Sequence, residues 1–163
     1  MPKYLSILLI SLLSISCNAT EILSGKVIKV SDGDTINILV NNKKHRIRFA
    51  EIDCPEKKQP WGKKAKTSLA EYIAGKNVQV EKITIDRYKR IIGKVFYDGE
   101  NINRKMVSNG HCWVYRKYMK DRSLLELEQD AKDNRRGLWQ LPEHERIPPW
   151  EYRKIQRDKR KKK

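Results

Sequence analysis

Two aspartates near the ends of predicted strands could together hold a metal ion. Asp34 follows the turn Asp32-Gly33, and Asp53 closes the stretch "RIRFAEID". Asp and Gly are common in every loop, so Asp34 alone would indicate only a turn. Two carboxylates from different strands, completed by a backbone carbonyl and water, make an oxygen-rich site that suits a hard cation such as Ca²⁺. The pair therefore predicts a cation site.

Two arginines and a glutamate could act on a phosphate beside that cation. Arg48 precedes Asp53 on the same strand, Arg90 lies in "DRYKR", and Glu56 follows a proline. A phosphodiester under attack accumulates negative charge on its oxygens, which planar guanidinium groups match. Glu56 could orient or deprotonate a water molecule. Each residue alone would be an ordinary surface side chain, but together they indicate phosphodiester chemistry.

The elements that must position these side chains predict a small barrel. Residues 22–52 contain three strands rich in β-branched residues and separated by "SDGD" and "NNKK". An amphipathic helix is predicted over 60–75, and two more strands over 77–97. Two further helices follow over 101–110 and 123–137. We predict an α+β, mainly β fold: a five-stranded oligonucleotide/oligosaccharide-binding (OB-fold) barrel with three helices.

The third strand changes its alternation just before Asp53. Ile47 and Phe49 would lie on one face, whereas Ala50 and Ile52 would lie on the other. A β-bulge or a strongly coiled barrel strand would produce such a slip.

The order of several short motifs resembles a known family. "DGDT", "RFAEIDCPE", "DRYKR", "GHCWVYRKY", "RRGLW" and "PPWEYR" follow one another as in the thermonuclease family of staphylococcal nuclease-like proteins. Each motif is modest singly, but the combination is specific and runs from Glu21 to Arg153. The resemblance implies Ca²⁺-dependent hydrolysis of phosphodiester bonds in DNA and RNA, with low sequence specificity and 3′-phosphorylated products.

The resemblance also implies roles for particular positions. Asp34 and Asp53 match the calcium-binding carboxylates of the family, and Cys54 matches a residue that lends its backbone carbonyl to the metal. The type enzyme has threonine at the Cys54 position, and it has glycine beside the second arginine, where Lys89 and Ile91 stand here. The other matches are the catalytic residues Arg48, Glu56 and Arg90, the pocket residue Tyr88, and the substrate-flanking residues Tyr115 and Tyr118.

Residues 1–19 predict a secretory signal peptide. A lone basic residue, Lys3, precedes an apolar run over 5–15, and small or polar residues follow. That run is shorter than the roughly 20 residues that a membrane-spanning helix needs. We expect cleavage after Ala19 and a secreted or periplasmic protein. The alternative is lipid anchoring to the cell envelope, because "SISC" ending at Cys17 loosely resembles a lipoprotein signal.

The predicted mature chain is strongly basic. The formal charge of +16 falls to +15 when Lys3 is removed with the signal segment, whereas small domains usually carry roughly 2 to 8 charges. This excess predicts a polyanionic partner. We expect DNA and RNA as substrates, no stable protein partner, and a monomer.

The C-terminal residues predict a tail distinct from the domain. We expect the nuclease-like domain to cover 20–153 and the basic segment 154–163 to be disordered. Two other functions remain open. A non-catalytic nucleic-acid-binding OB-fold module would lack one or more of the catalytic residues, and an anionic-surface-binding protein would act through the tail.

Two cysteines remain after the predicted cleavage. Cys54 and Cys112 could form a disulfide, because an exported chain meets oxidising conditions, or they could be two separate buried side chains. The three histidines have no spacing typical of a zinc site.

Overall fold

The computed structural model describes residues 20–162 of the chain. The predicted signal segment 1–19, which includes Cys17, lies outside the described residues.

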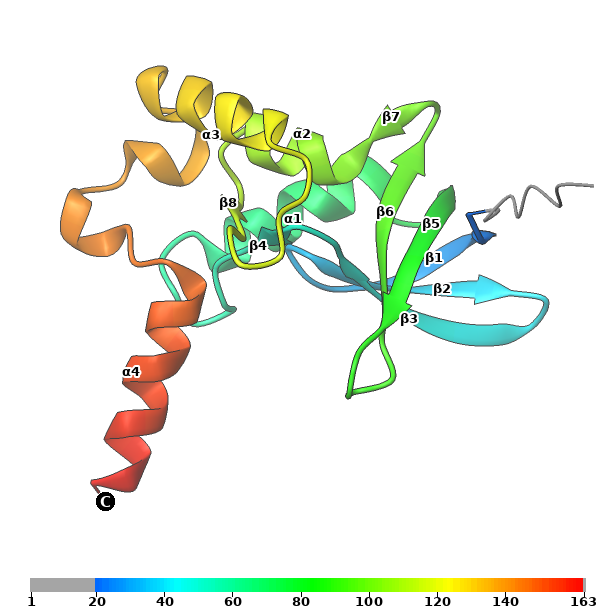
Figure 1. Ribbon diagram of the computed structural model, residues 1–163, viewed down its shortest axis with the longest axis horizontal. Helices are drawn as coiled ribbons and strands as arrows, with labels where there is room; N and C mark the ends of the chain where they lie inside the picture. Colours follow the sequence, from blue (N-terminus) through cyan, green and yellow to red (C-terminus); the bar gives the residue numbers. More distant parts are fainter. Residues whose placement is uncertain (1–19, 163) are drawn as a thin grey trace, which may run out of the picture.

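Five strands close into a small barrel (Figure 1). Neighbouring strands follow the order β3-β2-β1-β5-β6, and parallel pairing between β3 and β6 completes the closure. The predicted α+β, mainly β OB-fold class is therefore confirmed. The barrel strands are β1 (Ile22–Asp32), β2 (Thr35–Val40), β3 (Lys43–Phe49), β5 (Asn77–Ile85) and β6 (Ile91–Tyr97), and the short β7 (Glu100–Asn101) pairs with β6.

Bulges in β1 give the barrel its curvature. The pairing of β1 with β2 shifts register between Val27 and Lys29 and again between Val30 and Asp32. An extra residue in one strand bends it and increases its twist, which a five-stranded barrel requires. Each barrel strand places at least one branched side chain in the core with 2% exposure or less: Val27, Ile36, Ile47, Val80 and Val95.

The predicted slip of alternation in the third strand is present, and Glu51 produces it. Glu51 has a left-handed φ of 66°, and its Oε1 accepts the backbone N–H groups of Lys120 at 2.6 Å and Asp121 at 2.7 Å. The chain leaves β3 here and forms β4 (Ile52–Asp53), which pairs with β8 (Trp113–Val114) instead of with the barrel. The slip therefore carries Asp53 out of the barrel wall.

Three helices lie near the positions predicted for them, the first two against barrel strands and the third against the second helix and β8. They are α1 (Gly62–Ile73), α2 (Ile102–Ser108) and α3 (Ser123–Asp133), and two 3₁₀ turns follow as η1 (Gly137–Gln140) and η2 (Glu143–Glu145). α1 begins two residues later than predicted, because Trp61 has a left-handed φ of 70°. It buries Ala65, Leu69 and Ile73.

A fourth helix, α4 (Pro149–Lys161), replaces most of the tail that we expected to be disordered. That expectation was wrong because it rested on the charge of the segment alone and left out its helix-start and helix-end residues. Pro149 opens the helix, Glu151 lies in its first turn, and three basic residues lie in its last turn, an arrangement that complements the helix dipole. α4 projects away from the barrel (Figure 1). Among the helices of residues 20–162, none is both long and apolar enough to cross a membrane.

A half-buried histidine links the start of α1 to the segment that follows α2. Trp61 Nε1 donates to His111 Nδ1 at 3.2 Å, and the Tyr72 hydroxyl lies 3.5 Å from His111 Nε2. Burial lowers the pKa of His111 from its ordinary 6.5 to about 4. The imidazole is therefore neutral in the folded protein at neutral pH.

This low pKa predicts an acid-sensitive contribution to stability. Between pH 6.5 and 4 the unfolded chain binds a proton at His111 that the folded chain does not bind, so the free energy of unfolding falls as the pH falls. We expect the loss from this residue to approach about 3 kcal/mol at pH 4. Urea unfolding at pH 7 and pH 4 should show that His111→Gln loses less stability than the wild type. The exposed His144, changed to Gln, serves as the control and should behave as the wild type does.

Candidate active site

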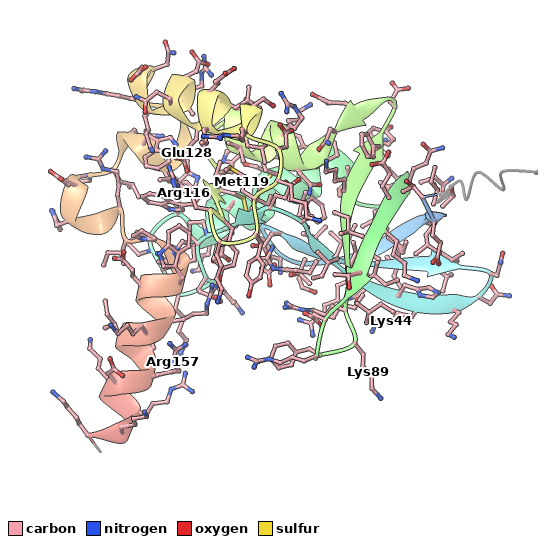
Figure 2. All side chains as sticks on the ribbon, in the orientation of Figure 1. Lys44, Lys89, Arg116, Met119, Glu128 and Arg157 are labelled. Atoms are coloured by element: carbon pink, nitrogen blue, oxygen red, sulfur yellow. A yellow bond between two sulfur atoms is a disulfide. The ribbon has the colours of Figure 1, made fainter. Side chains whose placement is uncertain are left out.

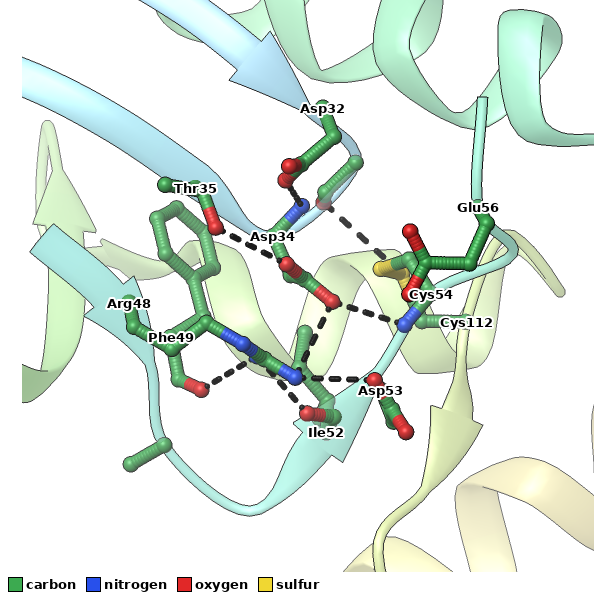
Figure 3. Close-up of polar contacts among 12 residues, drawn as sticks. Asp32, Asp34, Thr35, Arg48, Phe49, Ile52, Asp53, Cys54, Glu56 and Cys112 are labelled. Carbon is green, nitrogen blue, oxygen red and sulfur yellow. Dashed lines mark hydrogen bonds and ion pairs between the residues drawn. A yellow bond between two sulfur atoms is a disulfide. The ribbon is translucent and has the colours of Figure 1, made fainter. Parts of the chain in front are cut away.

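Arg48 links two buried carboxylates. Its Nη2 lies 3.2 Å from Asp34 Oδ2 and 2.9 Å from Asp53 Oδ1 (Figure 3). Its Nη1 donates to the backbone carbonyls of Phe49, the last residue of β3, and Ile52, the first residue of β4, both at 2.9 Å. The β2–β3 ladder sets Arg48 opposite Thr35, so the arginine lies beside the turn that carries Asp34. The structure thus brings together Asp34, Arg48 and Asp53, which sequence analysis had selected separately.

A disulfide between Cys54 and Cys112 lies against the turn that carries Asp34 (Figure 3). A Cβ atom at Gly33 would come within 2.9 Å of Cys54 Cβ, so the turn packs directly on the disulfide and only glycine fits there. The N–H of Cys54 donates to Asp34 Oδ2 at 2.8 Å. These contacts fix Asp34 against the start of the Cys54-Pro55 segment.

Asp32 is a further acid of the site that sequence analysis treated only as a turn residue. Burial and the charge of Asp34 raise the pKa of Asp32 from 3.8 to about 7. Its Oδ1 accepts the N–H of Asp34 at 3.2 Å. At neutral pH Asp32 is therefore partly protonated, which reduces the negative charge beside Asp34.

The backbone of Glu56 is held by contacts with α1 and Gln59, whereas its side chain is exposed to solvent. A Cβ at Gly62 would lie 1.9 Å from the Glu56 carbonyl oxygen, so the start of α1 rests directly on this peptide. The N–H of Glu56 donates to Gln59 Oε1 at 3.1 Å, and Gln59 in turn donates to the carbonyl of Ile147. The Glu56 side chain is 42% exposed, which leaves its carboxylate within reach of water.

Arg153 on α4 joins Asp53 to Glu56. Its Nη2 lies 2.6 Å from Asp53 Oδ2 and its Nη1 lies 2.8 Å from Glu56 Oε1. Burial alone would lower the pKa of Arg153, but the bonds to Asp53 and Glu56 raise it well above its ordinary value, so the guanidinium stays charged. Arg153 lies in the motif "PPWEYR", but no role was predicted for it. The motif was the only sequence feature that could have pointed to Arg153. The contact between Arg153 and Asp53 joins residues that are 100 positions apart in the chain.

Asp53 is the most buried acid of the site, with an exposed fraction of 1%. Burial raises its pKa above the ordinary 3.8, and the hydrogen bonds from Arg153 and the charge of Arg48 offset only part of that rise.

Arg90 lies in the turn between β5 and β6 and is held by Asp86. Its Nε donates to Asp86 Oδ2 at 2.7 Å, and its backbone N–H donates to Asp86 Oδ1 at 2.9 Å. Burial would raise the pKa of Asp86, but these bonds outweigh it and the pKa is lowered. Ile91 pairs with Ile47 across the barrel seam, so this turn lies next to the strand of Arg48. Figure 2 labels Lys89 at its tip.

The three tyrosines predicted to bind substrate fall into two groups. Tyr88 lies on the β5–β6 turn and is 62% exposed. Tyr115 and Tyr118 meet edge to face, with ring centroids 4.9 Å apart. Trp150 of α4 stacks parallel on Tyr115 at 5.4 Å. The Tyr115–Trp150 stacking and the Arg153 contacts therefore hold the same end of α4 against the site.

The acids of this site suit Ca²⁺. The carboxylates of Asp34 and Asp53 lie close together, because one oxygen of each contacts the same Arg48 nitrogen. Hard oxygen donors of this kind are the ligands that Ca²⁺ prefers. Within residues 20–162 no three His, Cys, Asp or Glu side chains are arranged so that they could hold a metal by themselves. Backbone oxygen, water and substrate would therefore complete the ligand set.

Comparison with known proteins assigns the family. Residues 46–141 match the model of the staphylococcal nuclease homologue family, SNase. The chain belongs to the staphylococcal nuclease family. An uncharacterised endonuclease of Escherichia coli is 42% identical over 130 residues, which cover 79% of this chain and 84% of the relative. A micrococcal nuclease of Shigella flexneri is 39% identical over 145 residues, covering 82% of each. The ParB protein of Escherichia coli is 35% identical over 162 residues, covering 93% of this chain and 90% of the relative.

The matched staphylococcal nuclease segment does not contain the whole site. It includes Arg48, Asp53 and Glu56, but it begins after Asp34 and ends before Arg153. In this member of the family, Asp34 comes from the β1–β2 turn and Arg153 from α4. The complete cluster is therefore assembled from three parts of the chain.

Proposed function

We propose that this nuclease is exported, requires Ca²⁺, and cleaves DNA and RNA with little sequence preference to leave 3′-phosphates. The observation that carries the proposal is Arg48 held between Asp34 and Asp53, with the accessible carboxylate of Glu56 joined to Asp53 through Arg153. Every residue that the family resemblance implies for the chemistry is present, which separates this chain from a binding module that has lost its acids.

Arg48 and Arg90 would bind the phosphate. Guanidinium groups match the oxygens of a phosphodiester and stabilise the charge that develops on them in the transition state. Arg48 is oriented by four contacts at the strand end. Arg90 is held on the neighbouring turn by Asp86, and it would reach the phosphate by exchanging that partner.

Glu56 would accept the proton of the attacking water. Arg153 holds Oε1 of this carboxylate, which leaves Oε2 for the water. The water oxygen forms a bond to phosphorus as its proton passes to Glu56, and the bond from phosphorus to the 5′-oxygen breaks. The 5′-oxygen takes the bonding electrons and a proton from solvent, so the phosphate stays on the 3′ side.

Asp34, Asp53 and the backbone carbonyl of Cys54 would hold the calcium ion. Bound there, Ca²⁺ would supply positive charge against the phosphate oxygens. Asp32 adds a third carboxyl group next to this set, and its raised pKa limits the repulsion with Asp34.

Export is supported by two independent features. Residues 1–19 have the pattern of a secretory signal, and a disulfide such as Cys54–Cys112 persists in oxidising compartments. We propose release as a secreted or periplasmic protein, with lipid anchoring at Cys17 as the alternative.

The test is cleavage of single-stranded DNA by the purified chain 20–163, with Ca²⁺, with chelator and with other divalent metals. We expect cleavage with Ca²⁺, none with chelator, and products that a 3′-phosphatase can modify. A chain that binds DNA but never cuts with any divalent metal would support the binding-module alternative. Products with 5′-phosphates would contradict the proposed bond of cleavage.

A further inference from the structure

The basic helix α4 starts at the active site. Its first two turns are held at two points: Trp150 stacks on Tyr115 at 5.4 Å, and Arg153 binds Asp53 and Glu56. Beyond Arg153 the helix runs into solvent (Figure 1). Its direction is therefore fixed by contacts with the residues proposed for substrate and metal binding.

Two more arginines lie on the same face of α4 as Arg153. Residues three, four and seven positions apart lie on the same side of a helix, so Arg157 and Arg160 follow Arg153 in one stripe. Both are exposed, and Figure 2 labels Arg157 on the projecting helix. Arg153 and Arg160 are separated by about 10 Å along the helix axis. Lys159, about 120° around the helix from Arg153, and Lys162, which follows the last residue of α4, lie off this stripe and form the opposite-side pair of the test below.

We propose that a nucleic-acid strand leaving the active site runs along this stripe, with successive phosphates bound by Arg157 and Arg160. The inference rests on the proposed function, because it takes the substrate strand to lie at Asp53 and Glu56. A basic surface beside aromatic rings is a usual surface for unpaired nucleic acid. Here the half-buried Tyr115–Trp150 pair lies at the point where the stripe begins.

The composition of α4 favours a strand over a lipid surface. A helix that lies in a membrane interface needs a broad apolar face opposite its charges. α4 offers Ile155, which is 41% exposed, but Lys154, Asp158 and Lys159 surround it. The guanidinium groups of the stripe instead match phosphates that arrive from the active site.

The test compares two double variants in a chain that cannot cut. Arg157→Gln/Arg160→Gln removes the stripe, and Lys159→Gln/Lys162→Gln removes the same charge from the opposite side. Both are made with Glu56→Gln, and binding of a thymidine dinucleotide and a thymidine dodecamer is measured over a range of salt concentrations. We expect the stripe variant to bind the dodecamer more weakly, with a slope of log K against log salt less steep by about 1.4, because each single-strand phosphate contact contributes about 0.7. Dinucleotide binding should be unchanged, and the opposite-side variant should stay close to its parent.

Two results would overturn the inference. Equal effects of both variants on the dodecamer would show a general charge effect. Loss of binding to phosphatidylserine vesicles by the stripe variant, with unchanged dodecamer binding, would assign the helix to a membrane instead. The outcome is separable from the proposed function: a wild-type chain that never cuts can still show the stripe effect, and a chain that cuts with Ca²⁺ can lack it.

Discussion

Glu56→Gln is expected to slow hydrolysis of single-stranded DNA by about 10²–10⁴-fold, the usual range for loss of a general base. Glutamine keeps the shape of the side chain and can still accept a hydrogen bond from Arg153, but it cannot take a proton from water. The loss should therefore appear in kcat, with little change in KM. Initial rates at saturating Ca²⁺ measure both constants.

A matched control shows whether the slower hydrolysis comes from Glu56 itself or from the loss of any one negative charge. Glu126 is exposed on α3, away from the Arg153 contacts, and Glu126→Gln should cleave as the wild type does. If Glu56→Gln retained wild-type kcat, the proton would have another acceptor, and Asp32 would be the next residue to change.

Opening the Cys54–Cys112 disulfide is expected to lower the free energy of unfolding by about 4 kcal/mol. The two cysteines are 58 residues apart, and a link across so long a loop restricts the unfolded chain strongly. The measurement is urea unfolding of the wild-type chain with and without reductant. Because the reduced wild type keeps both sulfur atoms, the comparison does not add a packing defect in the core.

The variant Cys54→Ala/Cys112→Ala extends the test to activity. The backbone carbonyl proposed to bind metal is unchanged by this substitution, so an intact Ca²⁺ requirement is expected at temperatures where the variant is folded. Equal urea midpoints for the oxidised and reduced wild type would show that the disulfide does not stabilise the fold.

The barrel was predictable because its strands have local signals. β-branched runs broken by "SDGD" and "NNKK" correspond to β1, β2 and β3, and the slip of alternation before Asp53 is present. The cause of the slip was not predictable from local sequence. Glu51 adopts its left-handed conformation while binding the N–H groups of Lys120 and Asp121, about 70 residues later in the chain.

The site was only partly predictable for the same reason. The residue types of Asp34, Arg48, Asp53 and Glu56 indicated phosphate chemistry, but the bridge from Arg48 to Asp34 depends on the register of β2 with β3. Arg153 reaches Asp53 across 100 residues, and no spacing rule predicts that contact. The segment after Arg153 was misjudged because its charge was considered without its helix-start and helix-end signals.

The placement of Arg48 and Arg153 also bears on whether folding or metal binding comes first. Carboxylates crowded in a protein interior repel one another and would oppose folding if nothing balanced them. Here the guanidinium groups of Arg48 and Arg153 offset part of that repulsion at Asp34 and Asp53. We therefore expect the chain to fold before it meets a metal ion, so that the supply of calcium would affect its activity and not its folding.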